Sequence, residues 1–282
     1  MESCGFCRSG AGRWPGWWWC WRRGWPRAGP GGAAAADVHV LTSGGLTAAY
    51  RILGPEFERA TGHRLITAQG ASMGQAPDAI PQRLARGEPA DVLLLAAGGL
   101  DALIAGGKAV PGSRVDIAES LIGLAVRSGA PRPDISTMEG FRRALLAAKS
   151  IAYSASASGV YIEAEMYRRM GLEAELAPKS RKILSERVGS VVARGEAEIG
   201  FQQMSELLPI QGIDTIGPIP REVQQVTVFS AGIAANAAQP AAARALIAFL
   251  ASPEAREALR KTGVEPMGAQ SPASPLSTSP AR

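Results

Sequence analysis

The chain has 282 residues, with 30 lysines and arginines against 25 aspartates and glutamates, and a formal net charge of +5. The excess is local, because residues 1–36 carry five arginines and one acid, and residues 37–270 carry 24 basic and 24 acidic groups. All six tryptophans and all three cysteines precede residue 26. A neutral body without cysteine argues against a nucleic-acid-binding surface and excludes a disulfide framework, a cysteine-ligated metal and a cysteine nucleophile there.

The two ends of the sequence lack the patterns of a folded domain. Residues 1–36 crowd Trp, Gly, Pro and Arg without a period of 2 or 3.6, and they end in four alanines. Two interpretations stay open: an unusual export signal cleaved near Ala36, or a start read in the wrong frame that rejoins the gene near the alanines. Both predict a mature protein that begins near Asp37. Residues 271–282 are rich in Ser and Pro and are expected to be disordered, and no apolar run is long enough to predict a membrane span.

From residue 37 onward, strand patterns alternate with helix patterns. The first part of this series predicts strands at 38–41, 64–68 and 91–96, a helix that begins after Ser43 and ends at Gly62, and helices at 75–86 and 99–106. The continuous apolar run at 91–96 is typical of a strand that is buried on both faces. Repeated strand–helix units of this kind predict a parallel sheet flanked by helices.

The pattern changes after residue 112. Extended segments are predicted at 113–117 and 121–126, followed by helices at 137–148, 159–170 and 186–194 and by strands at 151–153, 181–184, 198–201, 212–217 and 224–231. Helices at 240–251 and 253–262 end the body. We therefore predict an α/β protein of two lobes, lobe 1 from 37–117 plus 219–270 and lobe 2 from 118–218. Each lobe is expected to be a mostly parallel sheet flanked by helices, with a ligand cleft between the lobes at the carboxyl ends of the strands.

Three predicted strand-to-helix turns combine hydroxyl groups with small residues. They are Thr42-Ser43-Gly44-Gly45, Gly70-Ala71-Ser72-Met73-Gly74 and Ser154-Ala155-Ser156-Ala157-Ser158-Gly159. Backbone N–H groups at a helix start, with serine hydroxyls beside them, can hold an anion without a full counter-charge. The alternative is that these serines only cap helices. Three such turns, split between the two lobes, favour the anion site.

The turn around Ser72 also matches the G-x-S-x-G pattern of hydrolase nucleophiles. That fold needs a histidine after the serine, but both histidines, His39 and His63, precede it. A Ser-His-Asp hydrolase and a histidine-rich metal site are therefore disfavoured, and no glycine-rich phosphate motif supports nucleotide binding. Two adjacent glutamines, Gln202 and Gln203, follow the strand at 198–201 and are candidate donors to a ligand, although they could equally be polar surface residues.

The candidate ligand-binding residues are thus Ser43, Gly44, Gly45, Ser72, Met73, Ser156, Ser158, Gly159, Gln202 and Gln203. No metal ligand, cofactor or catalytic residue is assigned. Six cations lie near the predicted cleft and are interpreted mostly as solvated helix faces: Arg83, Arg86, Lys179, Arg181, Lys182 and Arg187.

In order and spacing, several segments resemble the type II periplasmic solute-binding proteins of ABC transporters, most closely the molybdate-binding branch. The resemblance covers about residues 37–265, through LTSGGLTAAY, QGASMG, RLARGEPADVLLLA, SASGVYIEAEMYRRMGL and VVARGEAEIGFQQMSELL. It implies two lobes that close on an oxyanion, with hydroxyls from Ser43 and Ser72 and a contribution from the Ser158-Gly159 turn. One position departs from the pattern, because the molybdate binders have a tyrosine where Gln203 stands. A carboxylate ligand is therefore at least as well supported as a tetrahedral oxyanion.

The stretches TSGGLTAAY, SASGVY and GFQQMSELLP of this sequence are similar to a subgroup of the family that resembles aconitate isomerase, an enzyme on the same scaffold. The resemblance implies a proton shift alpha to a carboxylate, which needs an anion clamp and an acid/base group. With no histidine in place, that group would be a carboxylate or a tyrosine, such as Glu206 or Tyr161, and spacing does not single out either.

The main hypothesis is an exported, periplasmic, monomeric protein that binds a small anion, a molybdate-like oxyanion or an organic carboxylate, for an ABC permease. The alternatives are an aconitate isomerase on the same scaffold and a ligand sensor that signals to a membrane receptor.

Overall fold

The computed structural model describes residues 35–267. The predicted export segment, apart from its last two residues, and the predicted disordered tail lie outside the described residues. Within 35–267, no helix has both the length and the apolar character that crossing a membrane requires.

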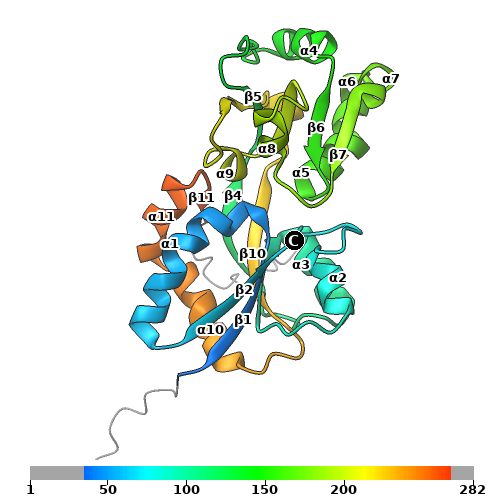
Figure 1. Ribbon diagram of the computed structural model, residues 1–282. Helices are drawn as coiled ribbons and strands as arrows, with labels where there is room; N and C mark the ends of the chain where they lie inside the picture. The colour runs from blue at the N-terminus through cyan, green and yellow to red at the C-terminus, as the bar shows by residue number, and fades with distance from the viewer. Residues whose placement is uncertain (1–34, 268–282) are drawn as a thin grey trace, which may run out of the picture. The chain divides into compact units, whose positions relative to one another are not determined.

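The first sheet has six strands in the order β11-β4-β10-β3-β1-β2 (Figure 1). They are β1 (Asp37–Thr42), β2 (Arg64–Gln69), β3 (Val92–Ala96), β4 (Val115–Ser120), β10 (Thr227–Ile233) and β11 (Glu265–Pro266). β1 pairs in parallel with β2 and β3, whereas β10 is antiparallel to both β3 and β4. The parallel part ends where β10, which comes from the far end of the sequence, enters the sheet.

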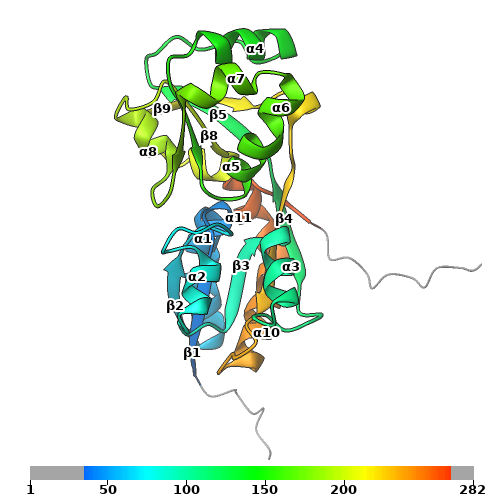
Figure 2. The same ribbon diagram turned by 90° about the vertical axis from the view of Figure 1, so that its right-hand side faces the viewer.

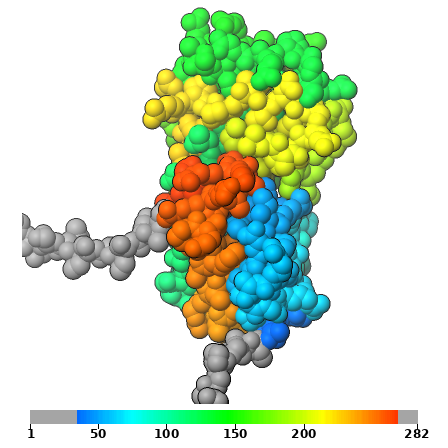
Figure 3. Space-filling model, turned by 90° about the vertical axis from the view of Figure 1, so that its left-hand side faces the viewer, coloured from blue at the N-terminus to red at the C-terminus, as the bar shows by residue number. Residues whose placement is uncertain are grey.

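Helices cover both faces of this sheet (Figure 2). One face packs against α1 (Gly44–Thr61), α10 (Pro240–Leu250) and α11 (Arg256–Lys261), and the other against α2 (Ile80–Ala85) and α3 (Ala97–Ala105). Figure 3 shows α10 and α11 lying against α1. The alternation of strand residues explains the two cores, because Val92 and Leu94 join the first while Leu93 and Leu95 join the second. The expected burial of this strand on both faces is confirmed.

The second sheet has five strands in the order β7-β6-β8-β5-β9. They are β5 (Ile122–Arg127), β6 (Ile151–Ser154), β7 (Ser180–Ile183), β8 (Ile199–Gln203) and β9 (Ile213–Pro218). One face packs against α4 (Met138–Ala147), α5 (Ala157–Tyr161), α6 (Tyr167–Met170) and α7 (Glu173–Leu176), and the other against α8 (Val188–Ala193). The short helix α9 (Met204–Leu207) follows β8 directly.

The two-sheet α/β class is confirmed, and both sheets are mixed. The nine strand pairings comprise four parallel and five antiparallel ones, so parallel pairing is less dominant than the sequence predicted. The chain passes from the first sheet to the second at Leu121 and returns between Pro218 and Thr227 through the short turn η3 (Arg221–Val223). Below, lobe 1 denotes the six-stranded sheet with α1–α3, α10 and α11, and lobe 2 the five-stranded sheet with α4–α9.

Several helices differ from their predicted extents. The helix expected over 75–86 begins only at Ile80, because Pro81 fixes a first-turn backbone and lacks an N–H. The helix expected over 159–170 is divided by a π-helical turn, η1 (Ile162–Met166), between α5 and α6. The last helix opens with a single 3-10 turn, η4 (Pro253–Ala255), before α11, and a similar turn, η2 (Ala177–Lys179), precedes β7.

Candidate functional site

A cavity of about 120 Å³ lies between the lobes, where strands of both sheets end. Its walls are loops and helix starts that follow the carboxyl ends of β1, β2, β6, β7 and β8. The lining residues are Gly44, Gln69, Gly70, Ala71 and Asp78 from lobe 1, and Ser154, Ala155, Ser156, residues 183–187, Gln202 and Glu206 from lobe 2. This is the place where α/β sheets bind ligands.

Two hydrogen bonds join the lobes beside this cavity. The Ser205 hydroxyl donates to the carbonyl oxygen of Gly45 at 2.8 Å. The backbone N–H of Ser72 donates to the hydroxyl of Ser156 at 3.2 Å. Residues of α1 and of the loop after β2 are thus held directly to α9 and to the loop after β6, respectively.

The carboxylate of Glu206 lies in the cavity at the first turn of α1. Glu206 is 8% exposed, and its Oε1 accepts a hydrogen bond from Nε2 of Gln202 at 3.0 Å. A Cβ atom built on Gly44 would lie 1.7 Å from this oxygen. Only glycine therefore allows the carboxylate of lobe 2 to approach this closely to the start of a helix in lobe 1.

Burial raises the pKa of Glu206 to about 7, because desolvation penalises its charged form. The positive charge of Arg187 opposes this rise, and so do hydrogen bonds from Gln202 and from the backbone of Gln203. Near neutral pH the side chain is therefore present in both protonation states, which is the condition for a group that takes up and returns a proton.

Gln202 connects this carboxylate to the start of α8. Its Oε1 accepts a hydrogen bond from the backbone N–H of Val188 at 2.9 Å, and its Nε2 donates to Glu206. These two contacts fix the orientation of the amide, because the N–H of Val188 requires an acceptor. Gln203 does not line the cavity, and its Nε2 donates instead to Oγ1 of Thr227 on β10 at 2.8 Å.

The predicted serine hydroxyls differ in what they contact. Ser43, at the N-cap of α1, is 1% exposed, and its Oγ has no hydrogen-bond partner among the described residues. The hydroxyl of Ser72 accepts from the N–H of Ala96 at 3.0 Å, and those of Ser158 and Ser154 share a hydrogen bond at 3.2 Å. Ser43 therefore keeps free hydrogen-bonding capacity, whereas Ser72 and Ser158 are engaged within the protein.

Ser43, Ser72 and Ser158 lie away from the cavity lining, and so do three further predicted residues. A Cβ atom on Gly45 would lie 2.0 Å from the ring of Phe229, so this glycine leaves room for the ring. A Cβ atom on Gly159 would collide with the carbonyl oxygen of Ser154, which packs against its backbone. Met73 lines a separate cavity of about 430 Å³, together with Tyr161.

The structure distinguishes the two candidate acid/base residues by where they lie. The hydroxyl of Tyr161 donates to the carbonyl oxygen of Val223 at 2.8 Å and accepts from Arg169 at 3.1 Å. Glu206 lines the cavity between the lobes and Tyr161 does not.

Three charged residues of the cavity, Asp78, Glu186 and Arg187, are not among the predicted site residues. Oδ1 of Asp78 is buried and has no hydrogen-bond partner among the described residues. Arg187 occupies the N-cap position of α8, whereas the sequence places it among the cations expected on solvated helix faces. Its place just after the strand predicted at 181–184 is the signal that could have identified it. Within 35–267, no group of three or more His, Cys, Asp or Glu side chains is arranged to hold a metal ion.

Comparison with known proteins gives relatives of two kinds. A model of the bacterial extracellular solute-binding proteins matches residues 38–265, which include every residue that lines the cavity. An aconitate isomerase from a Pseudomonas species is 48% identical over 231 residues, covering 82% of this chain and 88% of that protein. The molybdate-binding protein ModA of Rhodobacter capsulatus is 29% identical over 234 residues, with 82% and 89% covered.

Solved structures share the fold. The periplasmic molybdate-binding protein of Azotobacter vinelandii matches with a TM-score of 0.64 at 22% identity, over 80% of this chain and 98% of that one. The sulfate-binding protein SubI of Mycobacterium tuberculosis matches with a TM-score of 0.62 at 16% identity, over 82% and 87%.

Proposed function

This chain belongs to the family of bacterial extracellular solute-binding proteins, and from that membership we propose that it is exported, binds a small polycarboxylate between its lobes and isomerises aconitate there. The observation that carries the proposal is Glu206, a buried carboxylate with a pKa of about 7 that lines the cavity at the start of α1. In a protein that only holds an anion, the ionised form of Glu206 would weaken binding, because its charge would repel the ligand.

The reaction needs one group that removes and returns a proton. Aconitate carries a double bond next to a CH2 group, and each outer carbon bears a carboxylate. The ionised Glu206 takes a proton from the CH2 carbon, and the electron pair of that C–H bond enters the three-carbon frame. The protonated Glu206 then returns the proton to the former vinyl carbon, so the double bond moves and no net proton is consumed.

The start of α1 supplies the second requirement. Charge builds up on the substrate carboxylates as the proton leaves, and the N–H groups of a helix start stabilise negative charge. The 48% identity to a protein named aconitate isomerase supports this choice of substrate.

A second candidate function is delivery of a bound anion to an ABC permease. The relative named ModA, at 29% identity, favours it, and so does the position of the cavity between two lobes. In this function the lobes close on the ligand and Glu206 stays protonated, as a hydrogen-bond donor to the anion.

The experiment that separates the two functions is a turnover assay with the purified protein. Conversion of trans- to cis-aconitate is followed by ultraviolet absorbance, and binding is measured separately by calorimetry. We expect Glu206→Gln to lower kcat by 10²- to 10⁴-fold, the usual contribution of a general acid/base, and to change the Kd for trans-aconitate by less than about threefold.

The matched control is Glu257→Gln, which removes an exposed carboxylate of α11 and should leave kcat unchanged. A wild-type protein without turnover overturns the isomerase proposal. If molybdate, sulfate or citrate then raises the melting temperature, the transport function stands, because a ligand of the folded state stabilises it.

A further inference from the structure

Among the residues that the structure describes, Arg187 is the one cation that lines the cavity, and no side chain there pairs with it. It is half-buried at the N-cap of α8, and among residues 35–267 its side chain makes no hydrogen bond and no ion pair. A guanidinium that is partly removed from water without a partner loses hydration that nothing in the protein replaces. Such a group indicates a binding partner that comes from outside the chain.

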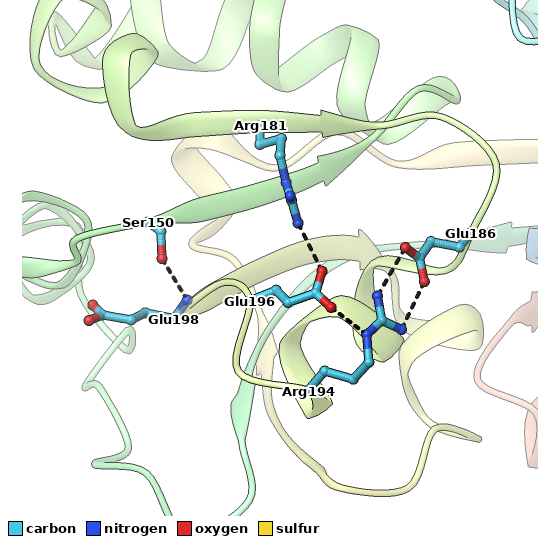
Figure 4. Close-up of polar contacts among 6 residues, drawn as sticks. All are labelled: Ser150, Arg181, Glu186, Arg194, Glu196 and Glu198. Atoms are coloured by element: carbon cyan, nitrogen blue, oxygen red, sulfur yellow. Dashed lines mark hydrogen bonds and ion pairs between the residues drawn. The ribbon is translucent and has the colours of Figure 1, made fainter.

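The neighbouring acid does not neutralise Arg187. The carboxylate of Glu186 is held by Arg194 through two hydrogen bonds of 3.0 Å. Arg194 also binds Glu196, which binds Arg181 in turn, so four side chains form one chain of ion pairs (Figure 4). This network holds Glu186 on the side of Arg194, and the charge of Arg187 is left for the cavity.

The charged groups that line the cavity are Asp78 from lobe 1 and Glu186, Arg187 and Glu206 from lobe 2. Glu186 is paired with Arg194, and neither Asp78 nor Glu206 forms an ion pair with Arg187. The cavity therefore offers two separate elements that attract anions, the start of α1 on one side and Arg187 on the other.

We propose that Arg187 binds one carboxylate of the ligand while the start of α1 binds another, and that this selects polycarboxylates over oxyanions with a single centre. The inference rests on the proposed polycarboxylate ligand and deepens it by naming the residue that determines specificity. An arginine side chain presents a planar fork of donors that matches a carboxylate. A tetrahedral oxyanion can occupy one of the two elements, whereas a di- or tricarboxylate reaches both.

Arg187 also acts on the proton chemistry of the site. Its charge lowers the pKa of Glu206, against the effect of burial. Loss of that charge raises the pKa of Glu206 and shifts the pH profile of kcat upward. A residue that only stabilised the loop would change the melting temperature and leave this profile in place.

The test compares Arg187→Gln with Arg181→Gln in the full-length protein. Both variants remove one positive charge from the region around β7, but Arg181 is exposed, pairs with Glu196 and does not line the cavity. Calorimetry with trans-aconitate and with sulfate is expected to show at least tenfold weaker binding of trans-aconitate by Arg187→Gln. Its sulfate binding, and both affinities of Arg181→Gln, should change less than about threefold.

Arg187→Lys serves as a second variant if Arg187→Gln does not fold. It keeps the charge but loses the fork, so trans-aconitate binding should weaken while the pH profile of kcat stays near that of the wild type. An unchanged trans-aconitate affinity in Arg187→Gln, or in Arg187→Lys if Arg187→Gln does not fold, overturns the inference. An equal loss of sulfate and trans-aconitate affinity also overturns it. A wild type that binds trans-aconitate through Arg187 but does not isomerise it leaves the inference standing and refutes the isomerase proposal alone.

Discussion

The two lobes contribute different chemistry to the same cavity. Lobe 1 brings mostly backbone and small residues from the ends of β1 and β2, such as Gly44, Gly70 and Ala71. Lobe 2 brings the ionisable side chains Arg187 and Glu206 from the ends of β7 and β8. Helix starts and small residues suit any small anion, whereas an arginine and a buried carboxylate suit particular ones. The comparison locates general anion binding in lobe 1 and selectivity and proton chemistry in lobe 2.

One residue of lobe 1, Asp78, differs from the small residues around it because it carries an ionisable side chain. Asp78 lines the cavity, and its Oδ1 is buried without a partner among the described residues. An acceptor in that position needs a donor from the ligand or from water. In lobe 2, by contrast, Gln202 satisfies the carboxylate of Glu206 from within the protein.

The largest expected effect outside the turnover and binding assays is on the pH dependence of stability. The pKa of Glu206 is raised from 4.5 to about 7 in the folded protein, so the folded state keeps a proton that the unfolded chain releases. The unfolded state therefore binds fewer protons between pH 4.5 and 7, and the free energy of unfolding falls by about 3 kcal/mol as the pH rises across this window. Urea unfolding of the wild type and Glu206→Gln at pH 5 and pH 8 measures this term.

The two proteins should differ little at pH 5, and at pH 8 Glu206→Gln should be the more stable by up to about 3 kcal/mol. All other titrating groups are common to both proteins and cancel in the difference. Equal slopes of stability against pH would show that Glu206 is not desolvated, and the contrast between the lobes would lose its main element.

A smaller effect is expected where the lobes approach most closely. In Gly44→Ala the new methyl group would lie 1.7 Å from Oε1 of Glu206, so the carboxylate must move. Because that carboxylate is the flexible end of a side chain, the free energy of unfolding should change by less than about 1 kcal/mol, while kcat falls about 10- to 100-fold through misplacement of the acid/base group. Assays of both quantities on one preparation check this split.

Gly54→Ala is the control in the same helix, because its nearest neighbour, Cδ1 of Leu65, would lie 3.4 Å away. It should keep full turnover and gain up to about 1 kcal/mol of stability from better helix propensity. A loss of turnover in Gly54→Ala equal to that in Gly44→Ala would assign the effect to α1 as a whole and not to the contact with Glu206.

Much of lobe 1 could be predicted from local sequence. The apolar run at β3 indicates burial on both faces, and the Ser43-Gly44-Gly45 turn places small residues and a hydroxyl at a helix start. Antiparallel pairing of β10 could not be predicted in the same way, because it depends on how the chain returns from the second sheet. A local sequence pattern predicts that a segment is a helix or a strand, whereas the strands it pairs with depend on the path of the whole chain.

The reactive part of the site was less accessible to sequence reasoning. Glu206 and Tyr161 were equal candidates, because burial and proximity to α1 are properties of the folded chain. Arg187 and Asp78 are separated by more than 100 positions and share a cavity only when the lobes meet. The local sequence around a charged residue beside a short helix is the same whether the side chain faces water or a ligand, so it does not distinguish the two.

The smallest expected effect concerns one of the hydrogen bonds between the two lobes. The Ser205 hydroxyl donates to the carbonyl oxygen of Gly45 at 2.8 Å, and this carbonyl belongs to the first turn of α1. Ser205→Ala removes one hydrogen bond worth about 1 kcal/mol, which shifts the balance between closed and open lobes about fivefold toward open. The Kd for trans-aconitate should rise by a similar factor while kcat at saturation stays unchanged, because bound substrate restores closure.

The control is Thr262→Ala, which removes a hydroxyl that is hydrogen-bonded only to carbonyl oxygens at the end of its own helix, and it should leave the Kd unchanged. A fall in kcat with an unchanged Kd would instead place Ser205 in the chemistry of lobe 2, next to Glu206, and would weaken the division of labour between the lobes.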